Sequence, residues 1–510
     1  MSPDPDPSPG NTSPMTGLLP FLKQARQQLL ALPAPRASTA AAASSLSPIT
    51  KGPVFVLGNQ SADLDSIISA ILYSYFFSRA DKKAHAPVVN LPDVPSGTEL
   101  RRLRPEFACA FELATSSRAE QAHLSGGGDD GNGAARLLQE HIVTVADLRE
   151  QLLSRRQDNT KLDLDAVLVD WNKPPNQEET EGTSGKDGRG SVDGLSDLAT
   201  FSVTGCIDHH ADEGFVPAAE ALSDDNPRII ELGPGSCTSL IIREVRRRGL
   251  WPSQKESFSF SAEEHNTNNS HDVEVEVAKL ALAAILIDTG NLTAEGKVTD
   301  IDRDAVSFLS QKISEARSSG SSTWNQKTFF DEIQHAKSHS LDWLTVDETL
   351  GRDYKDWTES TALGEKVTIG IASVVRPLSW VISKANEEEE GSNARGEDEL
   401  NPLIGKLKQF AQQKGLDVVS AMTAFTSHEG RFERELLVWA LHDGCTKQLE
   451  TFAETAREEL QLEQWEQFPV EGRRENGHLY IWRQRNVRNS RKQVAPLLRK
   501  IYTGSRSTHN

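Results

Sequence analysis

Acidic and imidazole side chains recur along the first part of this 510-residue chain, each at a point where an apolar stretch ends. Six of them stand out: Asp63, Asp65, Asp170, His209, His210 and Asp288. Carboxylates combined with imidazoles are ligands that suit Mg²⁺, Mn²⁺ or Co²⁺, whereas a structural zinc site would normally recruit cysteine. Two such ions, about 3.5 to 4 Å apart, can lower the pKa of a shared water and stabilise both oxygens of an in-line phosphoryl transfer. These residue types therefore predict a metal-dependent phosphohydrolase.

Each carboxylate also has an ordinary structural interpretation. Asp63 and Asp65 in GNQSADLDS stand between a strand-like and a helix-like segment, where they could form a turn and cap the helix. Asp170 in AVLVD could begin a loop, and Asp288 in ILIDTGN could be an exposed terminal residue. Asp208, beside the two histidines in CIDHHADEG, could fix the tautomer of one of them. The occurrence of the whole set in one predicted domain favours a metal centre.

The elements that must position these residues alternate between strand and helix. Strand-like PVFVLG, AVLVD and VTGCID alternate with helix-like LDSIISAILYSYFF and SCTSLIIREVRRRG, which predicts an α/β domain with a mostly parallel sheet. Periodicity leaves the apolar run before Asp288 open between helix and strand. The loop at residues 233–238 (GPGSCT) could offer backbone N–H groups to an anion, or simply start a helix with Ser236 as N-cap.

Changes in composition divide the chain. We expect an N-terminal extension with a short helix at residues 1–49, a catalytic domain at 50–310, a linker at 311–323 and a smaller α+β domain at 324–505. Gly-, Ser- and acid-rich stretches at 117–135, 173–197, 253–272 and 385–401 are typical of solvated insertions.

Bulk properties narrow the function. The formal charge of −19 argues against general nucleic-acid affinity, although a local field can still bind an anionic substrate. No apolar run is long enough for a membrane span, and the four cysteines are too far apart for a C-x-x-C site, so we expect a cytoplasmic protein. Residues 17–32 could be a mitochondrial presequence, but Asp4 and Asp6 precede them and favour a packing helix. No obligate protein partner is expected.

The order GNQSADLDS, LVDWN, IDHHADEG and ILIDTGN resembles the four motifs of the DHH phosphoesterase superfamily, and the similarity extends from about residue 50 to the C-terminus. Within that superfamily, ELRRLRPEF, LTVDETLGRDYKDW, GIASVVRPLSW and NSRKQVAPLL are similar to the eukaryotic, fungal-type exopolyphosphatases. The resemblance implies a two-domain enzyme that releases terminal orthophosphate from inorganic polyphosphate, with its active site in the cleft between the domains.

The resemblance also implies roles for individual residues. Two divalent ions, Mn²⁺ or Mg²⁺ with Co²⁺ as an alternative, would be held by Asp63, Asp65, Asp170, His209 and Asp288. Asp170 would bridge the ions, Asp208 would orient a neighbouring group and His210 would face phosphate. Asn59 stands where related manganese pyrophosphatases have a metal-binding histidine, so this position offers at most a weak ligand.

Three basic residues are candidates for substrate binding. Arg491 and Lys492 follow several arginines in an otherwise acidic chain, and arginine can bind phosphate oxygens bidentately. A basic run is usually a solvated face, and the resemblance selects only these two residues from it. Arg376 is a further candidate, which could instead cap the end of a strand.

Two other functions remain open at this stage. A related hydrolase could act on pyrophosphate, nucleoside tetraphosphates or cyclic nucleotides, as in prune-like relatives. Alternatively, the acidic insertions could recruit partners to a non-catalytic interaction protein, but that reading predicts missing ligands, and all the carboxylate motifs are present.

Overall fold

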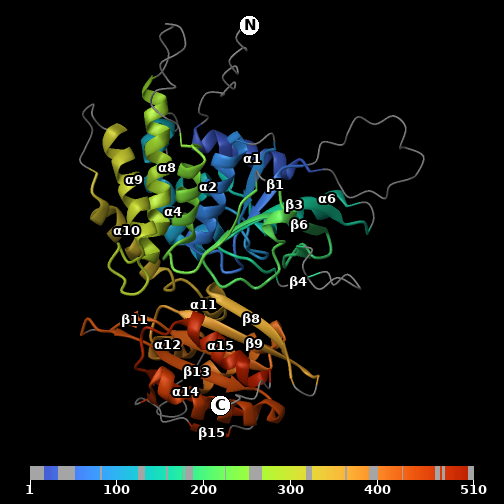
Figure 1. Ribbon diagram of the computed structural model, residues 1–510. Helices are drawn as coiled ribbons and strands as arrows, with labels where there is room; N and C mark the ends of the chain where they lie inside the picture. Colours follow the sequence, from blue (N-terminus) through green and yellow to red (C-terminus); the bar gives the residue numbers. More distant parts are fainter. Residues whose placement is uncertain are drawn as a thin grey trace, which may run out of the picture. The chain divides into compact units, whose positions relative to one another are not determined.

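A computed structural model of the chain describes residues 17–32, 52–80, 83–123, 133–156, 159–174, 176–177, 188–223, 226–251, 267–316, 324–361, 364–389, 400–427, 429–465, 471–473 and 477–503. The chain divides into two units, Met1–Ala336 and Lys337–Asn510 (Figure 1). Helix α9 (Asp300–Ala316) includes the first residues of the expected linker, and the rest of that linker lies outside the described residues. Part of each expected insertion lies outside them as well.

A mostly parallel sheet forms the centre of the first unit. Its strand order is β2 (His85–Val88), β1 (Val54–Leu57), β3 (Leu162–Val169), β6 (Ala199–Asp208), β5 (Arg189–Ser191) and β4 (Asn176–Gln177), and β7 (Arg228–Ile230) also pairs with β6. The pairs among β2, β1, β3, β6 and β7 are parallel, while β5 is antiparallel to both neighbours. The carboxyl ends of β1, β3, β6 and β7 therefore meet at one edge of the sheet, where open α/β sheets bind ligands.

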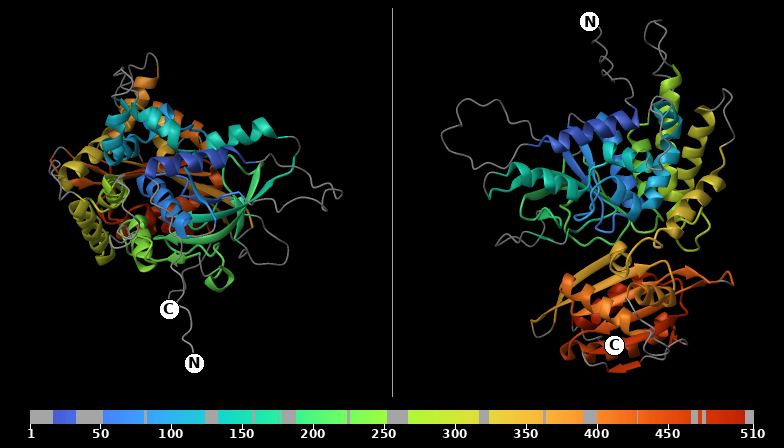
Figure 2. Two further views of the ribbon diagram at one scale, coloured as in Figure 1. Left: turned by 90° about the horizontal axis from the view of Figure 1, so that it is seen from above. Right: turned by 180° about the vertical axis from the view of Figure 1, so that it is seen from behind.

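Helices cover both faces of this sheet (Figures 1 and 2). Alternate residues of β1 and β3, such as Phe55 and Leu168, pack in one apolar cluster with α1 (Leu18–Leu30) and α6 (Val145–Arg155). The other face is covered by α2 (Leu64–Ala80) and α7 (Cys237–Arg247), which pack with α8 (Thr267–Asp288) and α9. Helices α3 (Thr98–Leu103), α4 (Pro105–His123) and α5 (Gly133–His141) and the short 3₁₀ helix Ala219–Ala221 complete the unit. A sheet buried on both sides explains why its central strands read as continuous apolar runs.

Two elements settle points that the sequence left open. The apolar run before Asp288 is the end of helix α8, and its residues 280–287 are all buried. A helix that is apolar on every side has no periodic pattern, because it is surrounded by other helices. The segment at 17–32 contains α1, whose Leu18, Leu22 and Leu29 are buried.

The second unit contains a mixed sheet with helices on its faces. The strand order is β14 (Leu462–Gln464), β16 (His478–Gln484), β13 (Glu435–Ala440), β10 (Val418–Thr423), β9 (Lys366–Val374) and β8 (Tyr354–Ser360), and β15 (Glu471–Arg473) pairs with β16. Only β9 and β10 pair in parallel among these described strands, and β11 (Phe425–Thr426) and β12 (Phe432–Glu433) form a separate hairpin.

Among the described residues, five α-helices complete this unit, and α10 (Gln326–His339) spans the division between the units. Helices α14 (Asp443–Leu460) and α15 (Arg491–Tyr502) share one apolar cluster with the sheet, and α11 (Val346–Arg352), α12 (Leu378–Glu388) and α13 (Asn401–Lys414) pack with one another. The predicted fold class, a mostly parallel α/β domain followed by a smaller α+β domain, is confirmed. None of the described helices is both long and apolar enough to cross a membrane.

Candidate metal centre

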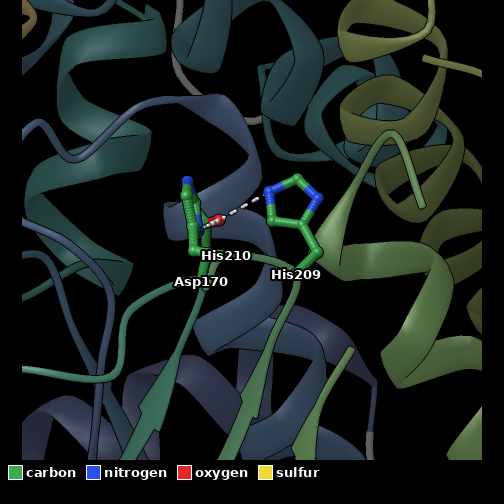
Figure 3. A group of neighbouring side chains, drawn as sticks. All are labelled: Asp170, His209 and His210. Atoms are coloured by element: carbon green, nitrogen blue, oxygen red, sulfur yellow. Dashed lines mark ion pairs between the residues drawn. The ribbon is translucent and has the colours of Figure 1, made fainter. Parts of the chain in front are cut away.

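The loops that follow three parallel strands bring the candidate ligands together. Asn59 and Asp65 follow β1, Asp170 follows β3, and His209 follows β6. Asp170 has a φ of +53°, in the left-handed region that few residues other than glycine adopt. Backbone strain of this kind costs on the order of 1 kcal/mol and concentrates at functional sites. Asp170, His209 and His210 each offer a ligand atom within 4.8 Å of the others (Figure 3).

The two oxygens of Asp170 have different surroundings. Oδ2 accepts hydrogen bonds from Asn59 Nδ2 at 2.8 Å and from Ser66 Oγ at 2.6 Å. Oδ1 is buried and has no hydrogen-bond donor among the described residues. It lies 3.1 Å from His209 Nε2 and 3.5 Å from His210 Nδ1. The protein thus holds one oxygen firmly and directs the other at the histidines.

The tautomer of His209 follows from its neighbour. His209 Nδ1 lies 2.8 Å from the carbonyl oxygen of Pro234, which can only accept, so Nδ1 carries the hydrogen. Nε2 then presents a lone pair to Asp170 Oδ1 and, at 4.0 Å, to Asp65 Oδ2. Ligands bound at about 2.1 Å to one octahedral ion lie about 3 Å apart when adjacent and about 4 Å apart when opposite. The separation of Asp170 Oδ1 and His209 Nε2 therefore fits two adjacent ligands of one cation. Asp65 lies outside the group of Asp170, His209 and His210, whose ligand atoms all lie within 4.8 Å of one another.

The electrostatics of Asp170 also suit a cation. Burial raises its pKa from the usual 3.8 to about 7, the charges of Asp63 and Asp65 add to the rise, and the contact with His209 opposes it. In the absence of a cation, this carboxyl would retain a proton near neutral pH. Carboxylate and imidazole donors without cysteine fit Mn²⁺, Mg²⁺ or Co²⁺, so the residues present match the predicted metals.

Asp208 and His210 form a second pair beside this centre. Asp208 Oδ1 accepts from His210 Nδ1 at 2.7 Å, and Oδ2 accepts from Asn172 Nδ2 at 2.6 Å. Burial alone would raise the pKa of Asp208, but the hydrogen bonds and charges of its neighbours outweigh it and lower the pKa below its usual value. The side chain of Asp208 is fully buried, whereas that of His210 is 25% exposed. An ionised Asp208 therefore orients an imidazole whose Nε2 can contact a substrate.

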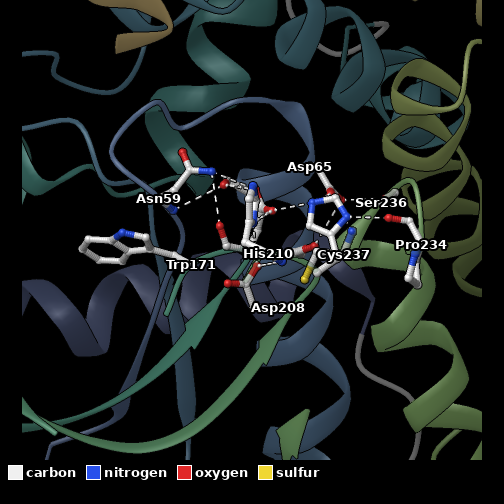
Figure 4. A network of polar contacts seen from close by, with 12 residues as sticks. Asn59, Asp65, Trp171, Asp208, His210, Pro234, Ser236 and Cys237 are labelled. Atoms are coloured by element: carbon white, nitrogen blue, oxygen red, sulfur yellow. Dashed lines mark hydrogen bonds and ion pairs between the residues drawn. The ribbon is translucent and has the colours of Figure 1, made fainter. Parts of the chain in front are cut away.

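Asp65 is held by the start of helix α7 (Figure 4). Its Oδ1 accepts from Ser236 Oγ at 2.7 Å and from both the N–H and the hydroxyl of Thr238, and its Oδ2 accepts from the Cys237 N–H at 2.6 Å. The loop at residues 233–238 thus binds an anion at a helix N-terminus, as one interpretation of the sequence allowed. The anion is a carboxylate of the protein itself.

Asp63 and Asn59 have local hydrogen bonds in this structure. Asp63 is exposed, and its Oδ1 accepts from the Ser66 N–H at 3.0 Å near the start of α2. Asn59 Oδ1 accepts from the Ser61 N–H at 2.9 Å while its amide nitrogen donates to Asp170. In this geometry Asn59 stabilises a ligand rather than offering its own oxygen.

Asp288 is the half-buried last residue of α8. The next residue, Thr289, packs closely against Gly235, because a Cβ placed on that glycine would lie 2.8 Å from Thr289 Cγ2. The end of α8 therefore lies beside the loop that holds Asp65. All the ligand assignments, those of Asp63, Asn59 and Asp288 included, stay predictions.

The three basic candidates belong to the second unit. Arg376 pairs with Asp342 at 2.8 Å, and its Nε has no hydrogen-bond partner among the described residues. Arg491, at the start of α15, donates to the carbonyl of Asp353 at 2.7 Å and to its carboxylate at 2.6 Å. Lys492 is exposed. Their roles in substrate binding stay predictions.

Sequence reasoning missed three residues that support the centre. Ser66 and Asn172 donate to Asp170 and Asp208, and each stands next to or near a ligand in its motif. Arg104 is buried and donates to the carbonyls of Ser61 and Ala62, so it holds the loop between β1 and α2. Nothing in ELRRLRPEF distinguishes a buried arginine of this kind from an exposed one.

The chain is similar to a known domain family, a curated protein and a solved structure. The sequence pattern of the DHHA2 domain matches residues 331–501, within the second unit apart from its first residues. A Schizosaccharomyces pombe protein named "Putative exopolyphosphatase" is 30% identical over 482 residues, which cover 94% of this chain and 96% of that protein. A solved structure titled "Crystal structure of Methanococcus jannaschii putative family II inorganic pyrophosphatase" is 19% identical, covers 88% of this chain and 98% of its own, and has a TM-score of 0.44. The chain belongs to the DHH phosphoesterase superfamily, in the family of the S. pombe protein.

Proposed function

We propose that this protein is a metal-dependent exopolyphosphatase that releases orthophosphate from the end of inorganic polyphosphate. The observation that carries the proposal is the approach of Asp170 Oδ1 to His209 Nε2 at 3.1 Å, with the imidazole hydrogen on the other nitrogen. Two electron-rich atoms at that distance repel each other unless a proton or a cation lies between them. The name of the S. pombe relative supports polyphosphate as the substrate.

The residues of the centre divide into ligands and supporting groups. Asp65, Asp170 and His209 would hold a divalent ion, and Asp63 and Asp288 would complete the site for two. When bound, such ions lower the pKa of water and withdraw charge from phosphate oxygens. The remaining donors keep the ligands in place before any ion binds, which reduces the cost of reorganisation.

His210 would contact the terminal phosphate through Nε2. Asp208 holds its Nδ1 hydrogen at 2.7 Å, so a protonated His210 can direct its second N–H at a phosphate oxygen. Asn172 in turn fixes the other oxygen of Asp208. His210 would thus stabilise charge that develops on the phosphate as the anhydride bond breaks.

Arg376, Arg491 and Lys492 would bind the polyphosphate chain. The net charge of −19 repels a polyanion, so binding needs a local concentration of cations. Arginine offers bidentate hydrogen bonds to phosphate, and lysine offers a point charge. For Arg491, phosphate would replace the carboxylate of Asp353.

The ligand role of Asp170 is tested by Asp170→Ala, assayed for orthophosphate release from polyphosphate of defined length with Mg²⁺, Mn²⁺ or Co²⁺. Removal of a residue that only supports a metal ligand typically costs up to about 100-fold in activity. Because Asp170 is proposed as a ligand itself, we expect the rate to fall by more than about 100-fold. Asp163→Ala is the matched control, because Asp163 lies on β3, the strand that Asp170 directly follows, is exposed and pairs with Arg189. Near-normal turnover of Asp170→Ala would remove Asp170 from the metal centre.

A second candidate substrate is a shorter phosphoanhydride or a phosphoester. Asn59 bears on this choice, because its amide donates to Asp170 where related manganese pyrophosphatases have a metal-binding histidine. A neutral amide at this position fits the resemblance to exopolyphosphatases, so it favours polyphosphate over pyrophosphate as the substrate. Rates on polyphosphate, pyrophosphate, a nucleoside tetraphosphate and a cyclic nucleotide, measured side by side, decide between them. Faster turnover of pyrophosphate than of polyphosphate would contradict the proposal.

A further inference from the structure

Asp302 is a carboxylate outside the candidate metal centre that is completely buried at the start of helix α9. Its oxygens accept from the Gly235 N–H at 2.9 and 3.1 Å and from Ser239 Oγ at 2.7 Å. They also accept from the N–H and the hydroxyl of Thr299, both at 2.8 Å. Burying a charge is costly unless it is well paired, so this many donors around one carboxylate indicates a specific role.

Helix capping explains only part of this arrangement. Thr299 precedes α9, and Asp302 is the third residue of the helix, so their contacts belong to the ordinary capping pattern. The contacts with Gly235 and Ser239 do not belong to it, because they join α9 to a segment more than 60 residues earlier in the chain. Asp302 therefore fixes the loop before α7 as well as its own helix.

The segment that Asp302 holds touches two candidate ligands. On one side of Gly235, the carbonyl of Pro234 accepts from His209 Nδ1 at 2.8 Å. On the other side, Ser236 donates to Asp65 at 2.7 Å (Figure 4). A displacement of Gly235 would therefore move a partner of His209 and a partner of Asp65 together.

Gly235 is also tightly packed against neighbouring residues. A Cβ on this residue would lie 2.5 Å from the carbonyl oxygen of Lys297 and 2.8 Å from Thr289 Cγ2. Both residues belong to the connection between α8 and α9, and Thr289 directly follows Asp288. The loop is thus pressed against this connection and held there by Asp302.

We propose that Asp302 is a positioning residue for the metal centre. It would act through the loop at residues 233–238, which sets the tautomer of His209 and the position of Asp65, without contacting metal or substrate itself. The inference rests on the metal centre of the proposed function. Groups that hydrogen-bond a metal ligand directly typically change metal affinity by about 10- to 100-fold when they are lost, and Asp302 acts one step further out, through the loop.

The test is the binding of Mn²⁺ alone to the full-length Asp302→Asn variant, measured by calorimetry well below its unfolding temperature. The amide keeps the shape of the side chain but replaces one acceptor by a donor that faces N–H and O–H groups. We expect Mn²⁺ binding to weaken by about 10-fold, the lower end of the range for direct partners of metal ligands. At saturating Mn²⁺, kcat should recover in large part, and KM for polyphosphate should stay near the wild-type value.

Asp304→Asn is the matched control, because Asp304 lies two residues further along the same helix, carries the same charge and is exposed. It should bind Mn²⁺ as the wild type does. A lower unfolding temperature of Asp302→Asn with unchanged Mn²⁺ affinity would reduce Asp302 to a structural residue and overturn the inference. Failure of the wild type itself to bind Mn²⁺ would instead overturn the proposed metal centre.

If Asp302→Asn does not fold, the Thr299→Val variant provides a second test of the inference. This variant removes only the hydroxyl bond to Asp302 and leaves the backbone N–H bond in place. The lost hydrogen bond is worth about 1 kcal/mol. If the loop passes this loss on to the candidate ligands, Mn²⁺ binding should weaken by about threefold to fivefold. Mn²⁺ affinity equal to that of the wild type would contradict the role of Asp302.

Discussion

The candidate metal centre depends on how each residue is held as much as on which residue it is. Asp170 has one oxygen fixed by Asn59 and Ser66, so that only Oδ1 faces His209. His209 has its hydrogen fixed on Nδ1 by a backbone carbonyl. Each ligand thus presents one defined atom to the site, as a metal with a strict coordination geometry requires.

The raised pKa of Asp170 predicts how the stability of the metal-free protein depends on pH. Between pH 4 and pH 7 the unfolded chain has lost this proton, whereas the folded protein keeps it, since its pKa rises from 3.8 to about 7. Unfolding then releases a proton, so the free energy of unfolding should fall as the pH rises through this window. Urea unfolding at pH 5, 6, 7 and 8 without metal measures the effect.

The Asp170→Asn variant isolates this contribution, because it keeps the shape of the side chain and removes the titration. As the pH rises, the free energy of unfolding of the variant should increase relative to that of the wild type. With Mn²⁺ present the trend should reverse, because a metal binds the ionised carboxylate and displaces its proton. A difference that stays constant from pH 5 to pH 8 would mean that Asp170 titrates normally.

At the scale of elements, the sequence predicted the strands and the helices that carry the site, but not the contacts between them. The strand-like segment PVFVLG, the loop GNQSADLDS and the helix after it could be predicted, because apolar periodicity and loop-forming residues are local signals in the sequence. The hydrogen-bond partners of Asp65 could not be predicted in this way, because Ser236 and Cys237 lie 171 and 172 residues further along the chain. The same holds for the carbonyl of Pro234, which decides the tautomer of His209.

The close approach of β1 to α2 gives a prediction at this scale. Gly58 follows β1, and a Cβ there would lie 2.8 Å from Ser66 Cβ and 3.0 Å from the Ser66 carbonyl oxygen. Gly58→Ala should therefore push α2 away, lower the free energy of unfolding by about 1–3 kcal/mol and weaken the bond from Ser66 to Asp170. Urea unfolding and the rate of orthophosphate release measure the two effects.

Gly405→Ala is the control for this substitution. Gly405 lies exposed inside α13, and a Cβ there meets no atom within 4 Å. Alanine should stabilise that helix by about 0.5–1 kcal/mol and leave activity unchanged. If Gly58→Ala behaved like Gly405→Ala, the strand and the helix would have room to separate, and Ser66 would not depend on their packing.

At the scale of the whole molecule, the proposed function requires the protein to bind a polyanion although it carries a net charge of −19. The candidate metal ligands belong to the first unit, whereas Arg376, Arg491 and Lys492 belong to the second. Proposed metal binding and the proposed binding of the polyphosphate chain by these three basic residues are therefore assigned to separate units, while His210 of the first unit would contact the terminal phosphate. This division predicts that a substitution can impair binding of the polyphosphate chain without impairing metal binding, and the reverse.

Arg491→Ala tests that independence. Arginine contributes charge-assisted hydrogen bonds to phosphate worth about 1.5–3 kcal/mol, so its loss should raise KM for polyphosphate by about 10- to 100-fold. Removal of Arg491 also leaves the carboxylate of Asp353 without this partner, which adds repulsion toward phosphate. Mn²⁺ binding, measured by calorimetry without substrate, should stay unchanged. Arg485→Ala is the matched control, since Arg485 lies in the same basic run and pairs with Glu463 at 2.6 Å. An unchanged KM for Arg491→Ala would mean that Arg491 serves only to bind Asp353, and that polyphosphate is held by other cations.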